Sequence, residues 1–345
     1  MFCVPTEGIF DVADRSAESL KQIARAYWDS SVLRALISLR LCPILDEGPA
    51  TAAELASRVG ANPRFLNAFL GACVALGLLD RQGERYANSQ QASAFLVLGK
   101  EGYSDDYLRH LTNHWNTFGA LDRLVREGVS ELPFQNGYVS ADEYWSDYMR
   151  AQHFRAVTVQ APYLVRTVNL SGKRKLLDLG GGAASYSVAL AAAYPGLTAH
   201  VIDAKEPLAI AREVVDEARL AGRVLLVEGD FCEMDLGHDA DAVLISAVVG
   251  IKPEVFCRNL FRLAYDALRP GGTLVLQDFM RIAGASPNRQ FLDAMTDLCL
   301  IAAFDPGGGD RQADEYASWL RDAGFLDVTQ HPEPPDLAII TATRP

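Results

Sequence analysis

The sequence lacks any run of about 18 uncharged apolar residues, the length that a membrane-spanning helix requires. Its first residues include Glu7, Asp11 and Asp14, where a secretory signal peptide would carry basic residues followed by an apolar segment. We therefore expect a cytoplasmic protein. Positive charge is also scarce, because 32 lysines and arginines face 44 acidic residues and leave a formal charge of −12. That balance opposes non-specific binding to nucleic acid or an anionic membrane, so we expect neither as a partner.

Closely spaced cysteines are missing as well. Six cysteines are scattered along the chain without a C-x-x-C pair: Cys3, Cys42, Cys73, Cys232, Cys257 and Cys299. Structural zinc sites and disulfide frameworks both depend on such spacing. We expect reduced, mostly buried thiols and no metal.

The chain does contain enough apolar sequence for a large interior. With 345 residues, 49% of them hydrophobic, it can bury one large core or two ordinary ones. Two domains are therefore expected.

The first of these has the pattern of a winged helix-turn-helix. Its expected elements are helical segments over 17–46 with a break near 29–31, a helix opened by the capping box Thr51–Glu54, a helix over 64–76, and a hairpin over 78–86. This fold raises the alternative of a DNA-binding regulator. A DNA-reading helix needs several Arg, Lys, Asn or Gln side chains at base-edge positions, whereas the helix over 64–76 offers one basic residue, Arg64. The sequence therefore argues against DNA binding.

Residues 103–170 are expected to form a helical connector. Two long amphipathic patterns, over 107–128 and 144–168, are separated by a turn at 132–137. Aromatic residues and histidines are dense here: His110, His114, Trp115, Phe118, Tyr144, Trp145, Tyr148, His153 and Phe154. Aromatic side chains at helical spacing fit either a plain core or the wall of a pocket. Both interpretations stay open.

From residue 175 onward, apolar runs alternate with helical patterns, as in a doubly wound sheet. Strands are expected at 175–179, 198–202, 223–227, 241–246 and 272–278, and helices at 184–193, 205–220 and 253–268. Residues 325–330 and 337–342 then pair as a late hairpin. Such a hairpin is unusual in a dehydrogenase domain.

A glycine-rich turn is the centre of this half. The strand over 175–179 runs into Gly180–Gly182, and the next strand ends in Asp203. Glycines let a ligand lie against the backbone, and an acid at the tip of the second strand can accept hydrogen bonds from both ribose hydroxyls. The pattern therefore predicts a nucleoside site. It departs from G-x-G-x-x-G at Ser185, and the carboxylate of Asp178 before the glycines suits a cationic amino-acid tail better than a phosphate.

These motifs resemble those of class I S-adenosylmethionine-dependent methyltransferases. They are Leu-Leu-Asp-Leu-Gly-Gly-Gly (176–182), Asp203, Glu-Gly-Asp-Phe (228–231) and Leu-Arg-Pro-Gly-Gly-Thr-Leu-Val-Leu (268–276). From about residue 15 to its end, the chain is similar to the small-molecule O-methyltransferases that include the acetylserotonin, caffeate and polyketide enzymes. The resemblance implies an α/β fold, with a Rossmann-like seven-stranded methyltransferase sheet behind an N-terminal all-α winged-helix dimerisation domain.

The resemblance also implies a division of labour along the chain. Residues 1–100 would form the dimerisation domain, 101–170 the helical connector and substrate-pocket wall, and 171–345 the domain that binds S-adenosylmethionine. The expected partners are a small-molecule methyl acceptor and a second copy of the chain, bound through the N-terminal domain.

Cofactor-binding residues follow from the same resemblance. They are Asp178, with Gly180 and Gly182 at the methionine part, Asp203 at the ribose, Asp230 and Phe231 at the adenine, and Ser246 near the amino-acid tail. A structural alternative remains for two of them, because an acid can simply end a strand and Phe231 can simply belong to the core.

One expected residue is absent. Relatives that methylate hydroxyls commonly carry a His-Asp pair after the fourth strand, and Gly250 and Ile251 stand there. Asp278 matches the acid that flanks this histidine and is left without the residue it would orient. Candidates for another base are His153, His114, Tyr144 and Tyr148. Two alternatives stay open: a sulfur or carbon acceptor that needs no base, and an enzyme that keeps the cofactor without transferring methyl.

Overall fold

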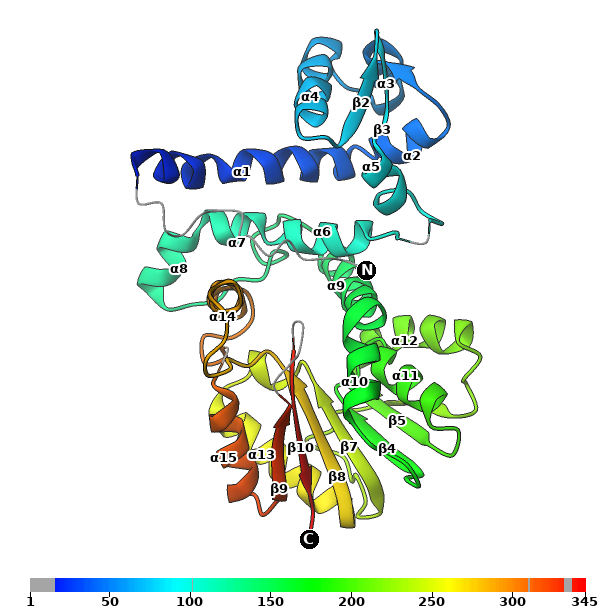
Figure 1. Cartoon of the computed structure of the whole chain (residues 1–345), viewed down its shortest axis with the longest axis vertical. Helices are drawn as coiled ribbons and strands as arrows, with labels where there is room; N and C mark the ends of the chain where they lie inside the picture. The colour runs from blue at the N-terminus through cyan, green and yellow to red at the C-terminus, as the bar shows by residue number, and fades with distance from the viewer. Residues whose placement is uncertain (1–15, 101, 310, 332–336) are drawn as a thin grey trace. The chain divides into compact units, whose positions relative to one another are not determined.

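The computed structural model describes residues 16–100, 102–309, 311–331 and 337–345. The chain divides into two compact units, residues 1–112 and 113–345, which we describe separately (Figure 1). Within the described residues, no helix combines the length and apolar character needed to cross a bilayer.

The N-terminal unit is a small helical domain with a three-stranded sheet. Its elements are α1 (Ala17–Ser38), α2 (Leu41–Asp46), β1 (Ala50–Thr51), α3 (Ala52–Val59), α4 (Pro63–Ala75), β2 (Leu79–Gln82), β3 (Arg85–Asn88) and α5 (Gln90–Phe95), and α6 (Asp105–Asn113) runs across the unit boundary. The sheet order is β1-β3-β2, and the expected hairpin is the antiparallel pair β2–β3. The capping box is confirmed, because Thr51 N donates to Glu54 Oε2 at 2.7 Å and Glu54 N donates to Thr51 Oγ1 at 3.3 Å.

The expected break near residues 29–31 is wrong, because α1 is continuous to Ser38. Ser31 Oγ donates to the carbonyl of Tyr27 at 2.6 Å, which satisfies this hydroxyl inside the helix. The chain breaks instead at Arg40, which is in the left-handed region with φ of 52°.

The connector of the second unit corrects another expectation. The single helix expected over 107–128 is three short ones: α6, α7 (Trp115–Gly119) and α8 (Leu121–Glu127). The ψ angles of His114 and Ala120 are 9° and 13°, so the backbone leaves the α-helical region at both joints. The second expected helix is α9 (Ala141–Arg155), a π-helical turn (Ala156–Gln160) and α10 (Ala161–Thr167). Single π-helical turns inside α-helices often occur at functional sites.

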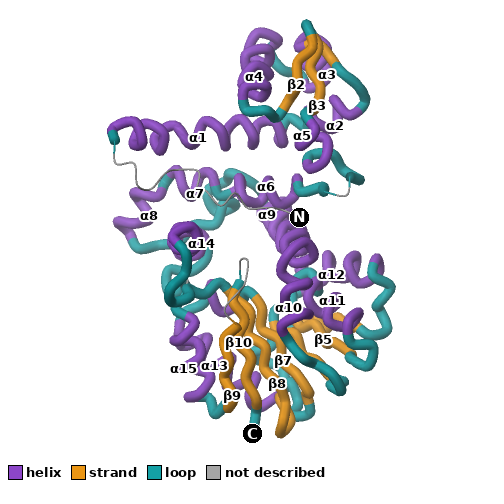
Figure 2. The backbone as a smooth tube through the Cα atoms, in the orientation of Figure 1, coloured by secondary structure: helices purple, strands orange, loops and turns teal. Residues whose placement is uncertain are grey.

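A seven-stranded sheet forms the body of this unit (Figure 2). The strands are β4 (Lys175–Leu179), β5 (Thr198–Asp203), β6 (Val224–Glu228), β7 (Ala240–Ser246), β8 (Leu268–Asp278), β9 (Leu326–His331) and β10 (Ala338–Thr343). Their order is β6-β5-β4-β7-β8-β10-β9. β10 pairs antiparallel with both β8 and β9, and the other neighbouring strands pair in parallel, so the expected strands and the late hairpin are confirmed.

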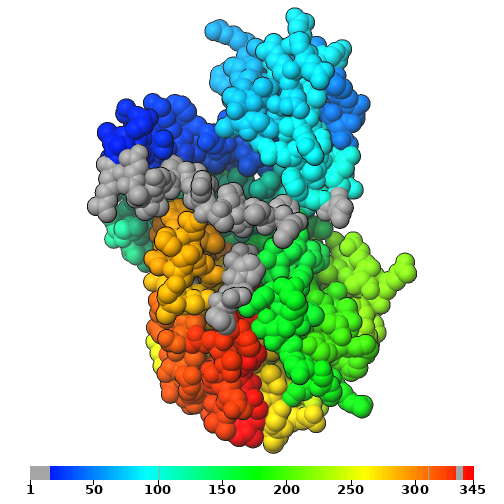
Figure 3. Space-filling model, viewed as in Figure 1, coloured from blue at the N-terminus to red at the C-terminus, as the bar shows by residue number. Residues whose placement is uncertain are grey.

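Helices cover both faces of this sheet. They are α11 (Ser185–Ala193), α12 (Lys205–Glu217), α13 (Glu254–Ala267) and α15 (Ala313–Asp322), while α14 (Pro287–Ala303) contacts α7. Neither α14 nor α15 was expected from the sequence. Two apolar clusters pack on opposite faces, and β7 is buried along its whole length. On the face drawn in Figure 3, the red closing strands lie beside the orange-red residues of α15 and below the orange residues of α14.

The strand order places a switch point beside β4. The chain goes from β4 outward to β5 and β6, and then returns to the other side of β4 with β7. Ligands of open α/β sheets bind at such a point, beyond the carboxyl ends of the strands. A ligand site is therefore expected beside the residues that end β4, β5, β7 and β8.

Candidate functional site

The turn after β4 requires glycine. Gly180 and Gly182 have φ of +74° and +54°. A Cβ atom on Gly180 would lie 2.8 Å from Val248 Cγ2, and one on Gly181 would lie 2.7 Å from the carboxyl group of Asp178. The turn therefore exposes bare backbone at the switch point, as the sequence predicted for a ligand that lies against it.

Asp203, which ends β5, is tied to this turn. One of its carboxylate oxygens accepts a hydrogen bond from Gly182 N at 2.8 Å, and the other accepts one from Ala204 N at 2.7 Å. Burial raises its pKa, and the two backbone donors oppose that rise. Each oxygen keeps a free lone pair, so the carboxylate is held in one orientation and can still accept from a ligand.

Asp178 lies beneath the same turn and is fully buried. Its Oδ2 accepts a hydrogen bond from Ser187 Oγ at 2.6 Å, while Oδ1 has no partner among the described residues. Burial raises the pKa of this carboxyl to about 7. A buried acceptor without a donor is costly, so this atom is suited to a cationic or N–H group supplied by a ligand.

Asp178 should make the stability of the cofactor-free protein depend on pH. Its pKa of about 7 in the folded protein lies above the ordinary value of 3.8, so its contribution to stability is complete below about pH 4 and is lost as pH rises through 7. Asp178→Asn cannot ionise. We expect its melting temperature, relative to the unchanged protein, to be higher at pH 8 than at pH 5 in thermal unfolding scans. An offset equal at both pH values would contradict the assignment.

The other predicted cofactor residues occupy different surroundings. Phe231 packs beside the glycine turn, 3.5 Å from where a Cβ of Gly180 would stand. Ser246 ends β7, is buried, and accepts a hydrogen bond from Gln277 Nε2 at 3.1 Å. Asp230 is exposed, and its Oδ1 accepts from Cys232 N at 2.8 Å. The structure thus brings Phe231 against the turn and places Ser246 at the same strand edge.

Three of the four base candidates belong to one aromatic cluster. The ring of Tyr144 stacks on Tyr148 with centroids 6.2 Å apart and meets His114 edge-on at 5.7 Å. The ring of Tyr148 also packs against Phe304, with centroids 5.9 Å apart. Burial lowers the pKa of His114 to about 4 and raises that of Tyr148 to about 12, so both are neutral near pH 7. The cluster forms an aromatic wall whose titratable groups carry no charge.

His153, the fourth candidate, contacts the cofactor loop instead. Its Nδ1 lies 2.9 Å from the hydroxyl of Ser185, the first residue of the helix that follows the glycine turn. Burial lowers its pKa below the ordinary value of 6.5. The imidazole is therefore neutral at pH 7 and able to take a proton.

Asp278, which has no histidine to orient at position 250, accepts hydrogen bonds from backbone N–H groups instead. Its Oδ2 accepts from Val249 N at 2.9 Å and Gly250 N at 3.2 Å, and its Oδ1 accepts from Phe279 N at 2.8 Å. Burial raises the pKa of this carboxyl to about 6 against these donors. A Cβ on Gly250 would lie 2.7 Å from Asp278 Oδ1, so the carboxylate fills the space that a side chain there would enter.

Gly250→Ala should therefore destabilise the protein. The carboxylate that the new methyl group would meet is buried and bonded to backbone, so relief requires moving a strand end or the turn. We expect a loss of at least about 1 kcal/mol in the free energy of unfolding, measured by urea denaturation. Gly119→Ala is the matched control, because a Cβ there meets nothing within 4 Å. Equal stability of the two variants would show that the contact is not restrictive.

Arg155, at the end of α9, was missed by the sequence analysis. Its guanidinium lies 5.1 Å from the ring centre of Phe279, and Nη1 is 3.4 Å from Gln152 Oε1. Its Nε is buried without a hydrogen-bond partner. An arginine at the end of a helix rich in aromatic residues was the available signal.

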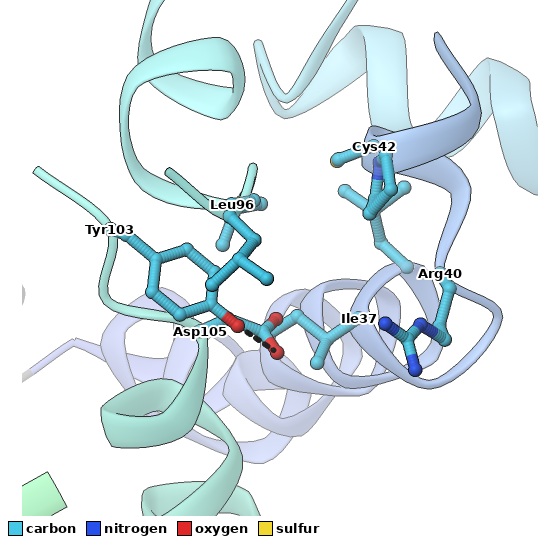
Figure 4. A pocket seen from close by; sticks show the side chains of 9 residues that line it. Ile37, Arg40, Cys42, Leu96, Tyr103 and Asp105 are labelled. Atoms are coloured by element: carbon cyan, nitrogen blue, oxygen red, sulfur yellow. Dashed lines mark hydrogen bonds between the residues drawn. The ribbon is translucent and has the colours of Figure 1, made fainter. Parts of the chain in front are cut away.

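A pocket in the N-terminal unit lies apart in sequence from these residues (Figure 4). It is lined by Leu36, Ile37, Arg40, Cys42, Pro43, Leu96, Leu98, Tyr103 and Asp105. Tyr103 Oη donates to Asp105 Oδ2 at 3.5 Å, and burial raises the pKa of Tyr103 to about 12. We assign this pocket no chemical role. Across the described residues, no group of three or more His, Cys, Asp or Glu side chains is arranged to hold a metal ion.

Comparison with known proteins finds matches along the chain. Residues 115–326 match the model of an O-methyltransferase domain, and residues 8–98 match that of an O-methyltransferase dimerisation domain. The N,N-dimethyltransferase OxyT of Streptomyces rimosus is 31% identical over 90% of both chains. The 3-hydroxy-5-methyl-1-naphthoate 3-O-methyltransferase of Streptomyces sahachiroi is 30% identical over 90% of this chain and 89% of its own.

Solved structures show the same fold. Human N-acetylserotonin methyltransferase in complex with SAM superposes with a TM-score of 0.81 at 23% identity, covering 97% of this chain and 99% of the other. PigF with SAH superposes with a TM-score of 0.84 at 22% identity, covering 95% of this chain and 99% of the other.

Proposed function

The chain belongs to the O-methyltransferase family with an N-terminal dimerisation domain, and on that premise we propose that it methylates a small hydroxyl-bearing acceptor with His153 as the base. Its cofactor is S-adenosylmethionine, and it is an enzyme of the methyltransferase class. The observation that supports the cofactor assignment best is the convergence of Gly180–Gly182, Asp178 and Asp203 at the switch point.

The residues at this point fit the cofactor. Asp203 would accept from the ribose hydroxyls, the bare backbone of Gly180 and Gly182 would lie along the methionine part, and Asp178 Oδ1 would meet its cationic end. Phe231 would border the adenine, with Asp230 at its rim and Ser246 near the amino-acid tail. Once bound, the cofactor supplies a sulfonium methyl group that a nucleophile can displace.

His153 would remove the acceptor proton. It is neutral at pH 7, because burial lowers its pKa, and Ser185 fixes its ring through Nδ1. Gly250 offers no base, and Asp278 is committed to backbone N–H groups. His114, Tyr144 and Tyr148 would then contribute the aromatic wall of the acceptor pocket.

A second candidate acceptor is an amine. Gly250 supports it, because a neutral amine attacks without prior removal of a proton, and the similarity to a protein named as an N,N-dimethyltransferase points the same way. The sulfur or carbon acceptors of the sequence analysis share that property but have no such relative among those named here.

We also propose a homodimer formed through the N-terminal domain. The match to a dimerisation domain supports it, as does an apolar surface on α1. There Leu20, Ile23, Tyr27 and Trp28 are 68%, 57%, 57% and 53% exposed. Apolar surface of this kind is typical of interfaces.

The test of the function has two steps. Titration calorimetry with S-adenosylhomocysteine measures cofactor binding, and its absence would refute the assignment. Transfer of radiolabelled methyl from the cofactor into a panel of phenols and aromatic amines then separates the two acceptor classes. Binding without transfer into any compound of a cell extract would instead favour an enzyme that keeps the cofactor for another reaction.

A further inference from the structure

We propose that Arg155 binds the carboxylate of the acceptor, so that the substrates of this enzyme are aromatic hydroxy acids. This inference deepens the proposed function and rests on it. Arg155 is a cation at the end of α9 that takes no part in the proposed proton transfer.

The guanidinium of Arg155 has no anionic partner in the part of the chain that the structure describes. Among the described residues no carboxylate forms an ion pair with it, its Nε is buried without a hydrogen bond, and its contact with Gln152 is long at 3.4 Å. Other partly buried arginines of this unit have partners for their donors: Arg281 pairs with Asp297 at 2.8 Å and Arg289 with Asp293, while Arg311 donates to the carbonyl of Gly307 at 2.7 Å. Arg155 therefore differs from its neighbours in keeping donors available.

Asp278 does not serve as the missing partner. It is close in sequence to Phe279, against which the guanidinium packs, but its two oxygens accept hydrogen bonds from three backbone N–H groups. Withdrawing a charge from water without pairing it is costly. A guanidinium presents N–H groups in a planar fork that matches a carboxylate in two-point contact, and a bound carboxylate would remove this cost.

The position of Arg155 favours the acceptor over the cofactor. Its guanidinium packs on Phe279, directly beyond the end of β8, whereas the glycine turn follows β4 and Asp203 ends β5. Strand β7 lies between β4 and β8, so with strands about 4.8 Å apart the two ends are roughly 10 Å from each other. The cation thus stands beyond the cofactor turn, on the side of the sheet where β8 ends.

Aromatic side chains surround the same space. Burial raises the pKa of Tyr148 and of Tyr186, and the positive charge of Arg155 opposes that rise in both. Arg155 is therefore close enough to interact electrostatically with both hydroxyls. Tyr148 in turn contacts Phe304 at 5.9 Å. These aromatic side chains and the single guanidinium of Arg155 would suit a flat aromatic acid. Its ring would pack against the aromatic side chains, and its carboxylate would bind the guanidinium.

Binding of matched probes tests the inference. 3-Hydroxy-2-naphthoate and its neutral carboxamide are titrated into the protein saturated with S-adenosylhomocysteine, using the unchanged chain, Arg155→Met and Arg155→Lys. We expect the acid to bind the unchanged protein at least about tenfold more tightly than the amide. Arg155→Met should abolish that preference, and Arg155→Lys should retain part of it because the charge remains without the planar fork.

The affinity for S-adenosylhomocysteine separates the two proposals. Its failure to bind any variant would overturn the proposed function, whereas normal binding with no preference for the acid would overturn the role of Arg155 alone. A preference that survives in Arg155→Met would also overturn it. So would a loss of cofactor affinity in Arg155→Met with the preference intact, because the guanidinium would then serve the cofactor's own carboxylate.

Discussion

His153→Ala is expected to lower kcat for a hydroxyl acceptor by about 100-fold or more, the contribution of a positioned general base, while the affinity for S-adenosylhomocysteine stays within about twofold. The imidazole is half-buried, neutral at pH 7, and held through Nδ1 by Ser185. Its removal leaves the glycine turn and Asp203 unchanged, so cofactor binding should persist. Steady-state kinetics and calorimetry on the same preparation measure both quantities.

A second variant, His153→Gln, distinguishes a role of His153 as the general base from a role in packing alone. His153→Gln can keep a hydrogen bond to Ser185 but cannot take the acceptor proton, so kcat should fall as far as in His153→Ala. The pH profile gives an independent check: activity of the unchanged enzyme should hold through pH 7 and fall on the acidic side, below 6.5, as the imidazole becomes protonated. Recovery of kcat in His153→Gln, or the same acidic limb in His153→Ala, would assign the proton transfer to another group. An amine acceptor would show little dependence on this residue.

The sheet and its cofactor turn could be predicted because their signals are local. The apolar run over 175–179, the three glycines after it and the acid at the end of the next run specify a strand, a turn and a second strand within about 30 residues. Backbone geometry then explains the glycines, since Gly180 and Gly182 have positive φ and Gly181 packs on Asp178. Parallel pairing brings Asp203 to the same edge because the carboxyl ends of such strands coincide.

Helix boundaries were harder to predict from the sequence, because apolar periodicity does not indicate where a helix ends. The serines at 30 and 31 suggested a break, but hydroxyls that bond to preceding carbonyls are tolerated within α1. In the connector, the same apolar spacing continues across three separate helices. Tertiary packing decided both cases, and single-sequence patterns contain little of it.

The acceptor side of the site depended on contacts distant in sequence. The carboxylate of Asp278 fills the space beside Gly250, 28 residues earlier, and no motif encodes that contact. Arg155 meets Phe279 across a still longer separation. The absence of the histidine was visible in the sequence. The carboxylate that fills the space beside Gly250, and a guanidinium without an ion pair among the described residues, emerged only from the fold.

Asp203→Ala should weaken binding of S-adenosylhomocysteine by about 10- to 100-fold, corresponding to about 1.5–3 kcal/mol for hydrogen bonds to a charged group. The carboxylate serves two sets of partners. It accepts from Gly182 N and Ala204 N in the protein, and its remaining lone pairs face the ribose hydroxyls in our proposal. The variant therefore loses both ligand contacts and an anchor of the turn, so the effect should lie toward the upper end of this range.

Two further variants show which loss matters. Asp203→Asn keeps one carbonyl oxygen and should lose less affinity than alanine. Asp239→Ala removes the same charge at the opposite edge of the sheet, where Asp239 pairs with Lys175 at 2.5 Å, and should leave cofactor affinity unchanged. Thermal unfolding without ligand checks that Asp203→Ala retains its fold, because Asp203 lies at a strand end and contributes little to the apolar clusters. Unchanged affinity in a folded Asp203→Ala protein would mean that the ribose lies elsewhere, and the nucleoside site at the switch point would have to be reassigned.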